Sequence, residues 1–271
     1  MTYIKLVYYT IFAVLYGGVG SLASLVMVNS TWTYRHIAQL WRGLPRSRLR
    51  VVFPPCYVSD LQTLSLANRE ATVLSIGQFR PEKDHALQLE AFALLLKRRR
   101  PPCPYQDVKL VLVGSCRGPG DQERVEELRK RAVELGLTNA QVRFVLNQPY
   151  SVLREWLGKA SVGIHTMWNE HFGIGVVEMM AAGLLVVAHK SGGPLTDIVV
   201  VDNANHQQEQ QTGFLASNAE EYADALHEAL SMSDTETIAL RQRARVSSNR
   251  FSDEVFSTRL QDALINSNVL R

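Results

Sequence analysis

Apolar and polar residues follow a regular alternation of two patterns from residue 72 onward. Short runs rich in Val, Leu and Ile, typical of buried strands, occur at 72–77, 108–114, 142–145, 161–165 and 184–188. Between them lie segments with the three-to-four-residue apolar spacing of helices, at 85–97, 121–135, 151–159 and 173–182. Strands that alternate with helices predict an α/β fold with a parallel, doubly wound sheet.

The alternation continues toward the carboxyl terminus. It predicts a short strand at 213–215, helices at 219–232 and 235–248, and a last amphipathic helix at 253–264. No internal repeat interrupts the series, and the stretch 203–211 has the composition of a polar loop.

The N-terminal segment allows three interpretations. Leu6 to Val28 carries no charged residue and is long enough to span a bilayer. Lys5 followed by the apolar stretch 6–15 also resembles a secretory signal peptide. Glycines and serines between 17 and 24 interrupt the run, however. The interruption favours a buried helix, a glycine turn and a short buried strand at 25–28 over membrane insertion, and either of these over a cleaved signal.

Composition narrows the classes of function. The 271 residues are 46% hydrophobic, enough for one large domain or two modest ones. A formal charge of +3, without a basic stripe interleaved with aromatics, argues against nucleic-acid binding. The run Lys97–Arg100 fits a solvated helix end better than a contact with anionic lipid head groups. The three cysteines, Cys56, Cys103 and Cys116, lack metal-ligand spacing and indicate a reducing compartment without a zinc site.

Two glutamates stand eight positions apart in the segment Asn169–Gly183. Glu170 lies in a glycine-containing loop after a predicted strand, and Glu178 lies inside the helix predicted to follow. Both carboxylates can therefore face the crevice beyond the carboxyl ends of the strands, where open α/β sheets bind their ligands. A carboxylate in an apolar helix needs hydrogen-bond donors, which sugar or ribose hydroxyls would supply. Taken singly, Glu170 also fits an exposed loop acid and Glu178 a carboxylate paired with a basic residue.

This pair, with its helix of small residues, resembles the donor site of the retaining GT-B glycosyltransferases, which carry an E-x7-E motif. Four further segments resemble, within that group, the α-1,2-mannosyltransferases that extend the lipid-linked oligosaccharide of N-glycosylation; they are 26–33, 51–56, 75–83 and 165–173. The likeness extends over about 3–251. It implies a complete C-terminal Rossmann-like domain at 51–250 and only the end of an N-terminal, acceptor-side Rossmann domain at 1–50. It also implies a C-terminal helix at 251–271 that crosses back toward the N-terminal domain.

The resemblance implies three catalytic residues. Glu170 would accept hydrogen bonds from the donor mannose and stabilise positive charge near its anomeric carbon. Arg80 and Lys83 would neutralise the departing diphosphate, as basic groups at a strand end can do. The wider family has an Arg directly after the strand-end glycine, whereas here Gln78 stands at that place and Arg80 follows. The alternative for both basic residues is a solvated turn around Pro81.

The resemblance also implies a set of donor-binding residues. They are Glu178, Phe172, Gly173, Ile174, Gly192, Gly193 and Gly114. Glu178 would accept from the ribose of GDP, the backbone N–H groups at the helix start would bind phosphate or sugar oxygens, and the glycines would lie beside the donor. The stretch Ser191–Pro194 also fits a plain turn. His165 and His171 flank the loop and are interpreted as structural residues, not as bases. The motif requires no metal and no cofactor besides the donor substrate.

The expected function is an α-1,2-mannosyltransferase that moves mannose from GDP-mannose to a dolichol-pyrophosphate-linked oligosaccharide with retention. Its expected partners are these two substrates, the endoplasmic reticulum membrane on its cytosolic face, and other early mannosyltransferases of the pathway, but no nucleic acid. On that face the sequon at Asn29 would remain unused. The alternative is a truncated, non-catalytic nucleotide-sugar-binding or scaffold form that needs a separate N-terminal half.

Overall fold

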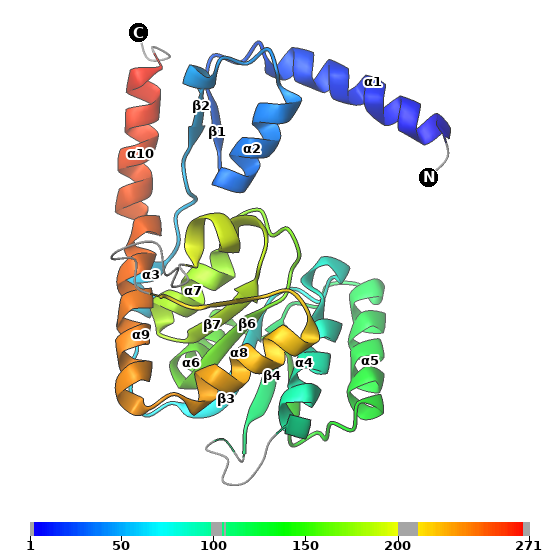
Figure 1. The fold of residues 1–271 in the computed structure, drawn as a ribbon, viewed down its shortest axis with the longest axis vertical. Coiled ribbons are helices and arrows are strands. Elements are labelled where there is room, and N and C mark those ends of the chain that lie inside the picture. The colour runs from blue at the N-terminus through cyan, green and yellow to red at the C-terminus, as the bar shows by residue number, and fades with distance from the viewer. Residues whose placement is uncertain (1–2, 99–104, 106, 200–210, 268–271) are drawn as a thin grey trace. The chain divides into compact units, whose positions relative to one another are not determined.

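The computed structural model describes residues 3–98, 105, 107–199 and 211–267. The chain divides into two compact units (Figure 1). The larger unit is Cys56–Ser252, and the smaller one combines Met1–Pro55 with Asp253–Arg271. The assignment of 1–50, 51–250 and 251–271 to the parts of a two-domain enzyme stays a prediction.

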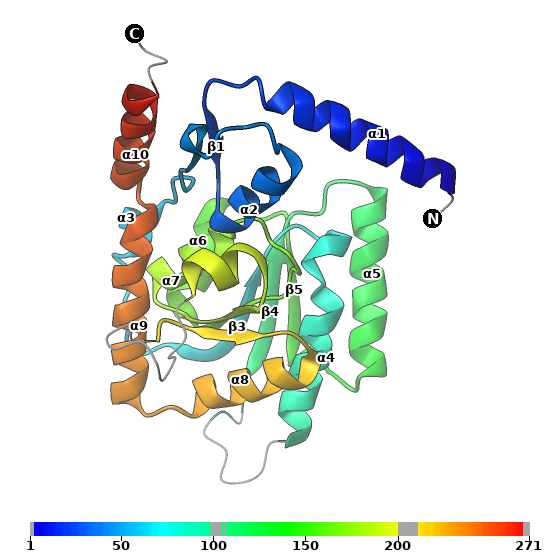
Figure 2. The same ribbon diagram turned by 45° about the horizontal axis from the view of Figure 1, so that its top comes forward.

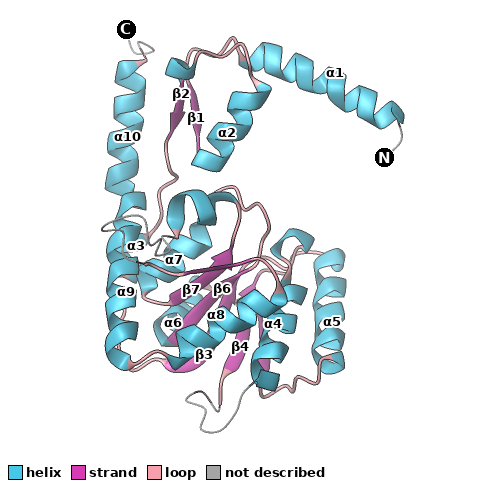
Figure 3. Ribbon diagram, in the orientation of Figure 1, coloured by secondary structure: helices cyan, strands magenta, loops and turns pink. Residues whose placement is uncertain are grey.

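The larger unit is built on a six-stranded, wholly parallel sheet (Figure 3). Its strands are β3 (Glu70–Ile76), β4 (Lys109–Gly114), β5 (Val142–Leu146), β6 (Ala160–His165), β7 (Leu185–His189) and β8 (Phe214–Ala216). Their order across the sheet is β5-β4-β3-β6-β7-β8, so the chain moves outward from β3 and then returns to its other side. The predicted parallel, doubly wound sheet is confirmed.

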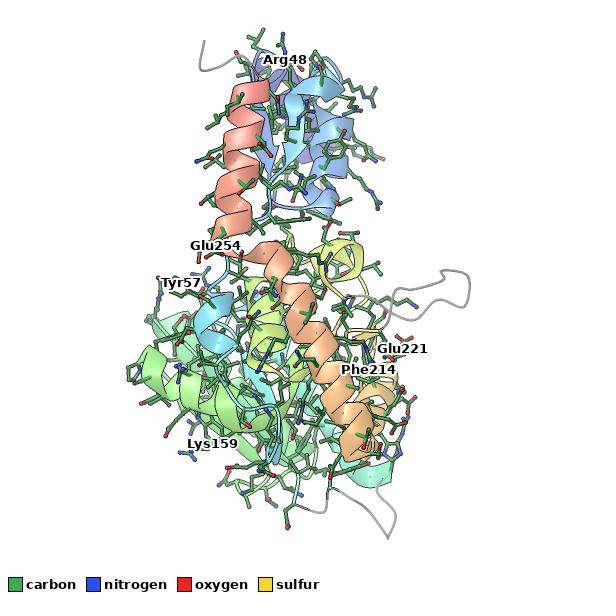
Figure 4. The ribbon with its side chains drawn as sticks, turned by 90° about the vertical axis from the view of Figure 1, so that its left-hand side faces the viewer. Arg48, Tyr57, Lys159, Phe214, Glu221 and Glu254 are labelled. Carbon is green, nitrogen blue, oxygen red and sulfur yellow. The ribbon has the colours of Figure 1, made fainter. Side chains whose placement is uncertain are left out.

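Helices cover both faces of this sheet (Figure 2). They are α3 (Val58–Leu61), α4 (His85–Arg98), α5 (Pro119–Glu134), α6 (Tyr150–Lys159), α7 (Ile174–Ala182), α8 (Ala219–Ser231) and α9 (Asp234–Ser248), with short turns η2 (Pro81–Lys83), η3 (Pro194–Ile198) and η4 (Asn249–Phe251). Helix α4 packs against α5 and α8, whereas α7 packs against α3, α6 and α9. Edge strand β8 lies beside α8, where Figure 4 labels Phe214 and Glu221.

The apolar runs are buried because parallel strands with helices on both faces exclude water from both sides. Val73, Leu110, Leu112, Val162 and Val187 have no more than 1% of their surface exposed. These side chains form one continuous core with the inner faces of α4, α5 and α8. A rigid sheet of this kind fixes the loops that leave its carboxyl edge.

The smaller unit has a much smaller core. It contains α1 (Tyr3–Gly20), β1 (Val26–Val28), α2 (Thr31–Leu40), η1 (Arg46–Arg48), β2 (Leu49–Val51) and α10 (Asp253–Asn266). Strands β1 and β2 pair in parallel. The buried cluster consists of Val28, Ala38, Leu44 and Leu49, with partly buried neighbours around it.

The N-terminal helix corrects the interpretation of a buried helix broken by glycines. Helix α1 continues through Gly17 and Gly18 to Gly20, and nearly all its side chains are exposed. A Cβ on Gly17 would lie 2.6 Å from the backbone oxygen of Leu40, and one on Gly20 would lie 2.3 Å from the ring of Trp41. These glycines therefore permit close packing against the end of α2 instead of ending the helix. Within the described residues, α1 is the one helix long and apolar enough to cross a membrane, a property that signal sequences and core helices share.

The cysteine and charge-run predictions fall partly outside the described residues. Cys56 and Cys116 are buried free thiols, and Cys103 is not among the residues described. Lys97 and Arg98 end α4, as expected for basic residues in a last helical turn, while the two arginines after them are not described. Within the described part of the chain no group of three potential metal ligands occurs.

Candidate functional site

Three segments that follow neighbouring strands meet at the carboxyl edge of the sheet. The first, after β3, holds Lys83; the second, after β6, holds Glu170; the third, after β7, holds Gly193. Hydrogen bonds join all three, since both Lys83 and Gly193 donate to Glu170. This edge is where open parallel sheets bind their ligands.

An ion pair between Lys83 and Glu170 lies at the centre of the site. Lys83 Nζ is 2.8 Å from Glu170 Oε2, and the two side chains are 26% and 16% exposed. The sulfur of Met167 lies 3.2 Å from the same ammonium. His165 Nε2 lies 3.4 Å from the same carboxylate oxygen. Two groups that can carry positive charge thus converge on one half-buried carboxylate.

The environment of Glu170 stabilises its ionised form. Burial by itself raises the pKa of this carboxyl, but hydrogen bonds from His165 and Lys83 and the charges of both groups outweigh burial. The net result is a pKa of about 2, against 4.5 for an ordinary glutamate. Glu170 is therefore a permanent anion at neutral pH, suited to face a developing positive charge.

The loop that carries Glu170 is held by the segment after β7. Asn169 has a left-handed backbone, with φ of 51°, and its N–H donates to Ser191 Oγ at 2.8 Å. Ser191 Oγ is in turn 2.9 Å from His189 Nδ1. Gly193 N–H donates to the backbone oxygen of Glu170 at 2.8 Å. These bonds fix the direction in which the Glu170 side chain leaves the loop.

Gly192 and Gly193 are required by this packing. A Cβ on Gly192, which has φ of 59°, would lie 2.1 Å from the backbone oxygen of Glu170. One on Gly193 would lie 2.3 Å from the backbone oxygen of Phe172. The plain-turn alternative therefore does not explain the pair, because the two glycines seat the Glu170 loop. A direct role at the donor stays a prediction.

Helix α7 begins immediately after this loop with an uncapped N-terminus. Gly173 is its N-cap in a left-handed conformation with φ of 114°, and no side chain in the described part of the chain caps the first turn. The first N–H groups of a helix have no intrahelical acceptor, and they carry the positive end of the helix dipole. Ile174 at the helix start is 46% exposed, whereas the Phe172 ring is buried against Phe251. Gly173 itself is buried, so the exposed helix start at Ile174 is the part of this helix end that can meet an anionic or hydroxylated ligand.

Glu178 lies one turn further along α7 and is half-buried. Burial raises the pKa of its carboxyl. No hydrogen bond or ion pair joins this side chain to any residue that the structure describes. The phenol of Tyr150 lies near enough that, after its own burial, the Glu178 charge is the largest cause of its raised pKa. A buried carboxylate without a basic partner leaves acceptor capacity for a ligand.

Arg80 and Gly114 are placed differently from the other predicted residues. Arg80 is exposed, and its guanidinium makes no hydrogen bond or ion pair within the described ranges. A Cβ on Gly114 would lie 1.8 Å from the backbone oxygen of Gly77, so glycine permits the ends of β3 and β4 to approach. Gly114 supports the strand end from which the Lys83 turn begins.

Four side chains of the site carried no functional prediction in the sequence. Thr166 and Gln88 are buried behind Lys83, His165 contacts Glu170, and Ser191 holds Asn169. Thr166, directly after a buried strand, had a usable signal, because polar residues at that place face the ligand edge. The partners of Gln88 and Ser191 are set by tertiary packing, which no local pattern shows.

Comparisons with known proteins identify the family of the chain. The family described as "Glycosyl transferases group 1" matches residues 60–249, and "ALG11 mannosyltransferase N-terminus" matches residues 1–41. The chain is similar to "GDP-Man:Man(3)GlcNAc(2)-PP-Dol alpha-1,2-mannosyltransferase" of Xenopus laevis, with 48% identity over 93% of this chain and 51% of the relative. The Homo sapiens protein of that name is 46% identical over 93% and 50%. The chain spans about half the length of the curated relatives it matches.

Solved structures share the fold. Anabaena Alr3699/HepE in complex with UDP has a TM-score of 0.69 and 26% identity, covering 89% of this chain and 64% of that one. Sucrose-phosphate synthase from Thermosynechococcus elongatus has a TM-score of 0.72 and 21% identity, covering 95% and 61%. The second likeness concerns the fold alone.

Proposed function

The chain belongs to the group 1 glycosyl transferases, and on that premise we propose that it supplies the donor-binding part of a GDP-mannose-dependent α-1,2-mannosyltransferase. The observation that carries the proposal is the Lys83–Glu170 ion pair beside the start of α7, with Glu178, which pairs with none of the described residues, on the same helix. The curated relatives named as mannosyltransferases support the choice of GDP-mannose. The similar HepE structure in complex with UDP supports a nucleoside diphosphate as part of the donor.

In this proposal each charged group has a defined partner on the donor. Glu178 accepts hydrogen bonds from the ribose hydroxyls of GDP. The backbone N–H groups at 173–174 and the ammonium of Lys83 contact the diphosphate, and Arg80 reaches the same anion from its exposed turn. Glu170 lies against the mannose ring and accepts from its hydroxyls. Gly192 and Gly193 keep the loop close enough for these contacts.

The chemistry needs charge stabilisation at two points. The bond between the mannose anomeric carbon and the β-phosphate oxygen breaks while a bond to an acceptor hydroxyl oxygen forms, and the hydroxyl proton passes to the departing phosphate. Negative charge gathers on the departing GDP, where Lys83 and the α7 N-terminus offset it. Positive charge gathers on the anomeric carbon, where the Glu170 carboxylate offsets it. The chain's own residues supply both effects.

The proposed acceptor is a dolichol-pyrophosphate-linked oligosaccharide, the acceptor for which the curated relatives are named. A dolichol-linked acceptor and a nucleotide-sugar donor meet at the endoplasmic reticulum membrane, and we place this chain on its cytosolic face beside other early mannosyltransferases. The glycosylation state of Asn29 tests on which face of the membrane the chain lies. It should remain unglycosylated in cells, and an endoglycosidase-sensitive mass shift lost in Asn29→Gln would overturn the topology.

Calorimetry on the purified chain tests donor binding. GDP and GDP-mannose should bind more tightly than UDP and UDP-glucose, and Lys83→Ala should weaken GDP binding about tenfold, as expected for one charge-assisted contact. Lys159, exposed at the end of α6, offers a matched control, and Lys159→Ala should bind like wild type. Equal affinity for uridine and guanosine nucleotides, or no heat with either, would remove the assignment.

A second candidate is a nucleotide-sugar-binding or scaffold form without transferase activity of its own. The observation that favours it is the coverage of about half of each relative. Incubation of the chain with GDP-mannose and a dolichol-linked acceptor separates the two. Release of GDP with formation of an extended glycan supports transfer, whereas tight binding without either product supports the scaffold.

A further inference from the structure

Thr166 is a buried hydrogen-bond junction behind the ion pair. It follows β6 directly and is 1% exposed. Its hydroxyl oxygen lies 2.8 Å from the backbone oxygen of Lys83 and 3.0 Å from that of Asp84, to which it donates. It also accepts a hydrogen bond from Gln88 Nε2 at 2.8 Å. One hydroxyl thus joins the turn after β3, the start of α4 and the loop after β6.

The junction ties together the two segments that hold the opposite charges. Lys83 ends the η2 turn, and Asp84 after it has a left-handed backbone with φ of 46°. Glu170 follows Thr166 by four positions (170 − 166 = 4), and Met167 between them contacts the Lys83 ammonium. Apart from the Lys83 side chain itself, the Thr166 hydroxyl is therefore the direct link between the Lys83 backbone and the Glu170 loop.

Gln88 is held in this junction at an energetic cost. It is 2% exposed, and its side-chain oxygen has no hydrogen-bond partner among the residues that the structure describes. An unsatisfied buried acceptor lowers stability, and an apolar residue of similar shape would avoid that cost. A side chain that contributes one bond to Thr166 and leaves its own oxygen unpaired fits a role in orientation better than a role in stability.

We propose that Thr166, oriented by Gln88, is a positioning residue that holds Lys83 at the distance from Glu170 on which the charge balance of the site depends. The hydroxyl fixes the Lys83 backbone, so the ammonium stays over the carboxylate without relying on its flexible side chain alone. Because the ion pair is formed by the chain's own side chains, this role can be measured in the free protein. Its consequence for nucleotide binding rests on the proposed function.

The test compares Thr166→Val, which keeps the shape but lacks the hydroxyl, with Thr166→Ser, which keeps the hydroxyl. Carbon-13 NMR of glutamate-labelled free protein follows the titration of the Glu170 carboxyl, identified by its loss in Glu170→Gln. In Thr166→Val its pKa should rise from about 2 toward that of an ordinary glutamate, and in Thr166→Ser it should remain near the wild-type value. Lys83→Met gives the effect of losing the ammonium completely.

Two results would overturn the positioning role: an unchanged Glu170 pKa in a folded Thr166→Val protein, or an equal rise in the serine variant. If the valine variant does not fold, Gln88→Met removes the orienting bond alone and should raise the same pKa.

Calorimetry measures the consequence for nucleotide binding. Thr166→Val should lower the affinity for GDP about tenfold. It should change the affinity for GMP, which lacks the β-phosphate, by less than about twofold. If wild type binds no nucleotide while the pKa result holds, the proposed function fails and the positioning role stands.

Discussion

Glu170 and Glu178 belong to one motif but lie in opposite electrostatic environments. Two groups that can carry positive charge surround Glu170 and lower the pKa of its carboxyl, whereas burial alone acts on Glu178 and raises its pKa. An identical residue type therefore has two different charge environments in one motif. Glu170 is a fixed negative charge, whereas the ionised form of Glu178 is costly without a hydrogen-bond donor.

The lowered pKa of Glu170 predicts how stability changes with pH. Because its folded-state pKa of about 2 lies below the ordinary 4.5, the ionised form stabilises the fold above about pH 4.5, and this contribution is lost as pH falls toward 2. The full contribution is on the order of 3 kcal/mol, of which about 2 kcal/mol is lost by pH 3. Urea unfolding between pH 6 and pH 3 should show a steeper loss in wild type than in Glu170→Gln. Parallel pH profiles of the two proteins would contradict the ion pair.

The raised pKa of Glu178 predicts a trade between stability and binding. Glu178→Gln removes a buried charge without a described partner, so the free protein should unfold at a higher temperature at pH 7. The same change should weaken the binding of GDP by about 1.5–3 kcal/mol, because charge-assisted hydrogen bonds to the ribose are lost. Thermal unfolding with and without GDP measures both effects. Unchanged GDP affinity would remove Glu178 from the ribose role.

At the scale of elements, the site depends on how closely the loops after β6 and β7 pack. Gly193→Ala places a Cβ against the backbone of Phe172, and its α-region φ of −60° means that steric overlap is the sole penalty. The change should lower the free energy of unfolding by about 1–3 kcal/mol. It should also weaken the binding of GDP. Gly120→Ala is the matched control. Its Cβ meets nothing within 4 Å on α5, so it should be neutral or stabilising by up to about 1 kcal/mol. Equal behaviour of both variants in chemical denaturation would exclude tight loop packing.

The N-terminal helix offers a second pair of neighbouring glycines. Gly17→Ala should separate α1 from the end of α2, because its Cβ would lie 2.6 Å from the Leu40 oxygen, whereas Gly18→Ala meets no atom within 4 Å. Gly18→Ala should stabilise the helix by about 0.5–1 kcal/mol. Circular dichroism should therefore show equal or greater helicity for this variant. Trp41 fluorescence should shift only in Gly17→Ala. A shift in both variants would mean that the two helices do not depend on this contact.

Strands and helices of the larger unit were predictable because each apolar run is either short and β-branched or spaced at helical intervals. The exposed helix α1 was not predictable from the sequence. Glycines near the end of an apolar run give the same sequence pattern whether they end a helix or permit another helix to approach. At the site, the sequence placed Glu170 and Lys83 in one crevice through family resemblance. Their direct ion pair and the Thr166 junction depend on backbone atoms brought together by β3 and β6, which residue types alone do not encode.

At the scale of the whole molecule, the two units differ in the size of their cores. The smaller unit buries only a few apolar side chains, such as Val28, Leu44 and Leu49, while the larger one has a continuous core across a six-stranded sheet. Backbone amides of β1 and β2 should therefore exchange hydrogen at least about tenfold faster than those of β3 and β4. Added GDP should slow exchange around α7 and leave β1 unchanged. Uniform exchange rates in all four strands would show that the chain unfolds as one cooperative body.

The pairing of β3 with β6 has a consequence for how the chain is made. Ile76 ends β3 and Ala160 begins β6, so 84 positions (160 − 76 = 84) separate two strands that lie side by side at the sheet centre. At roughly 5–20 residues per second on the ribosome, β3 waits about 4–17 s before its neighbour has been synthesised. During that wait one edge of a mostly apolar strand is open to pairing with wrong partners. The growing chain is therefore most exposed to aggregation in this interval, before Glu170 and Glu178 have been synthesised.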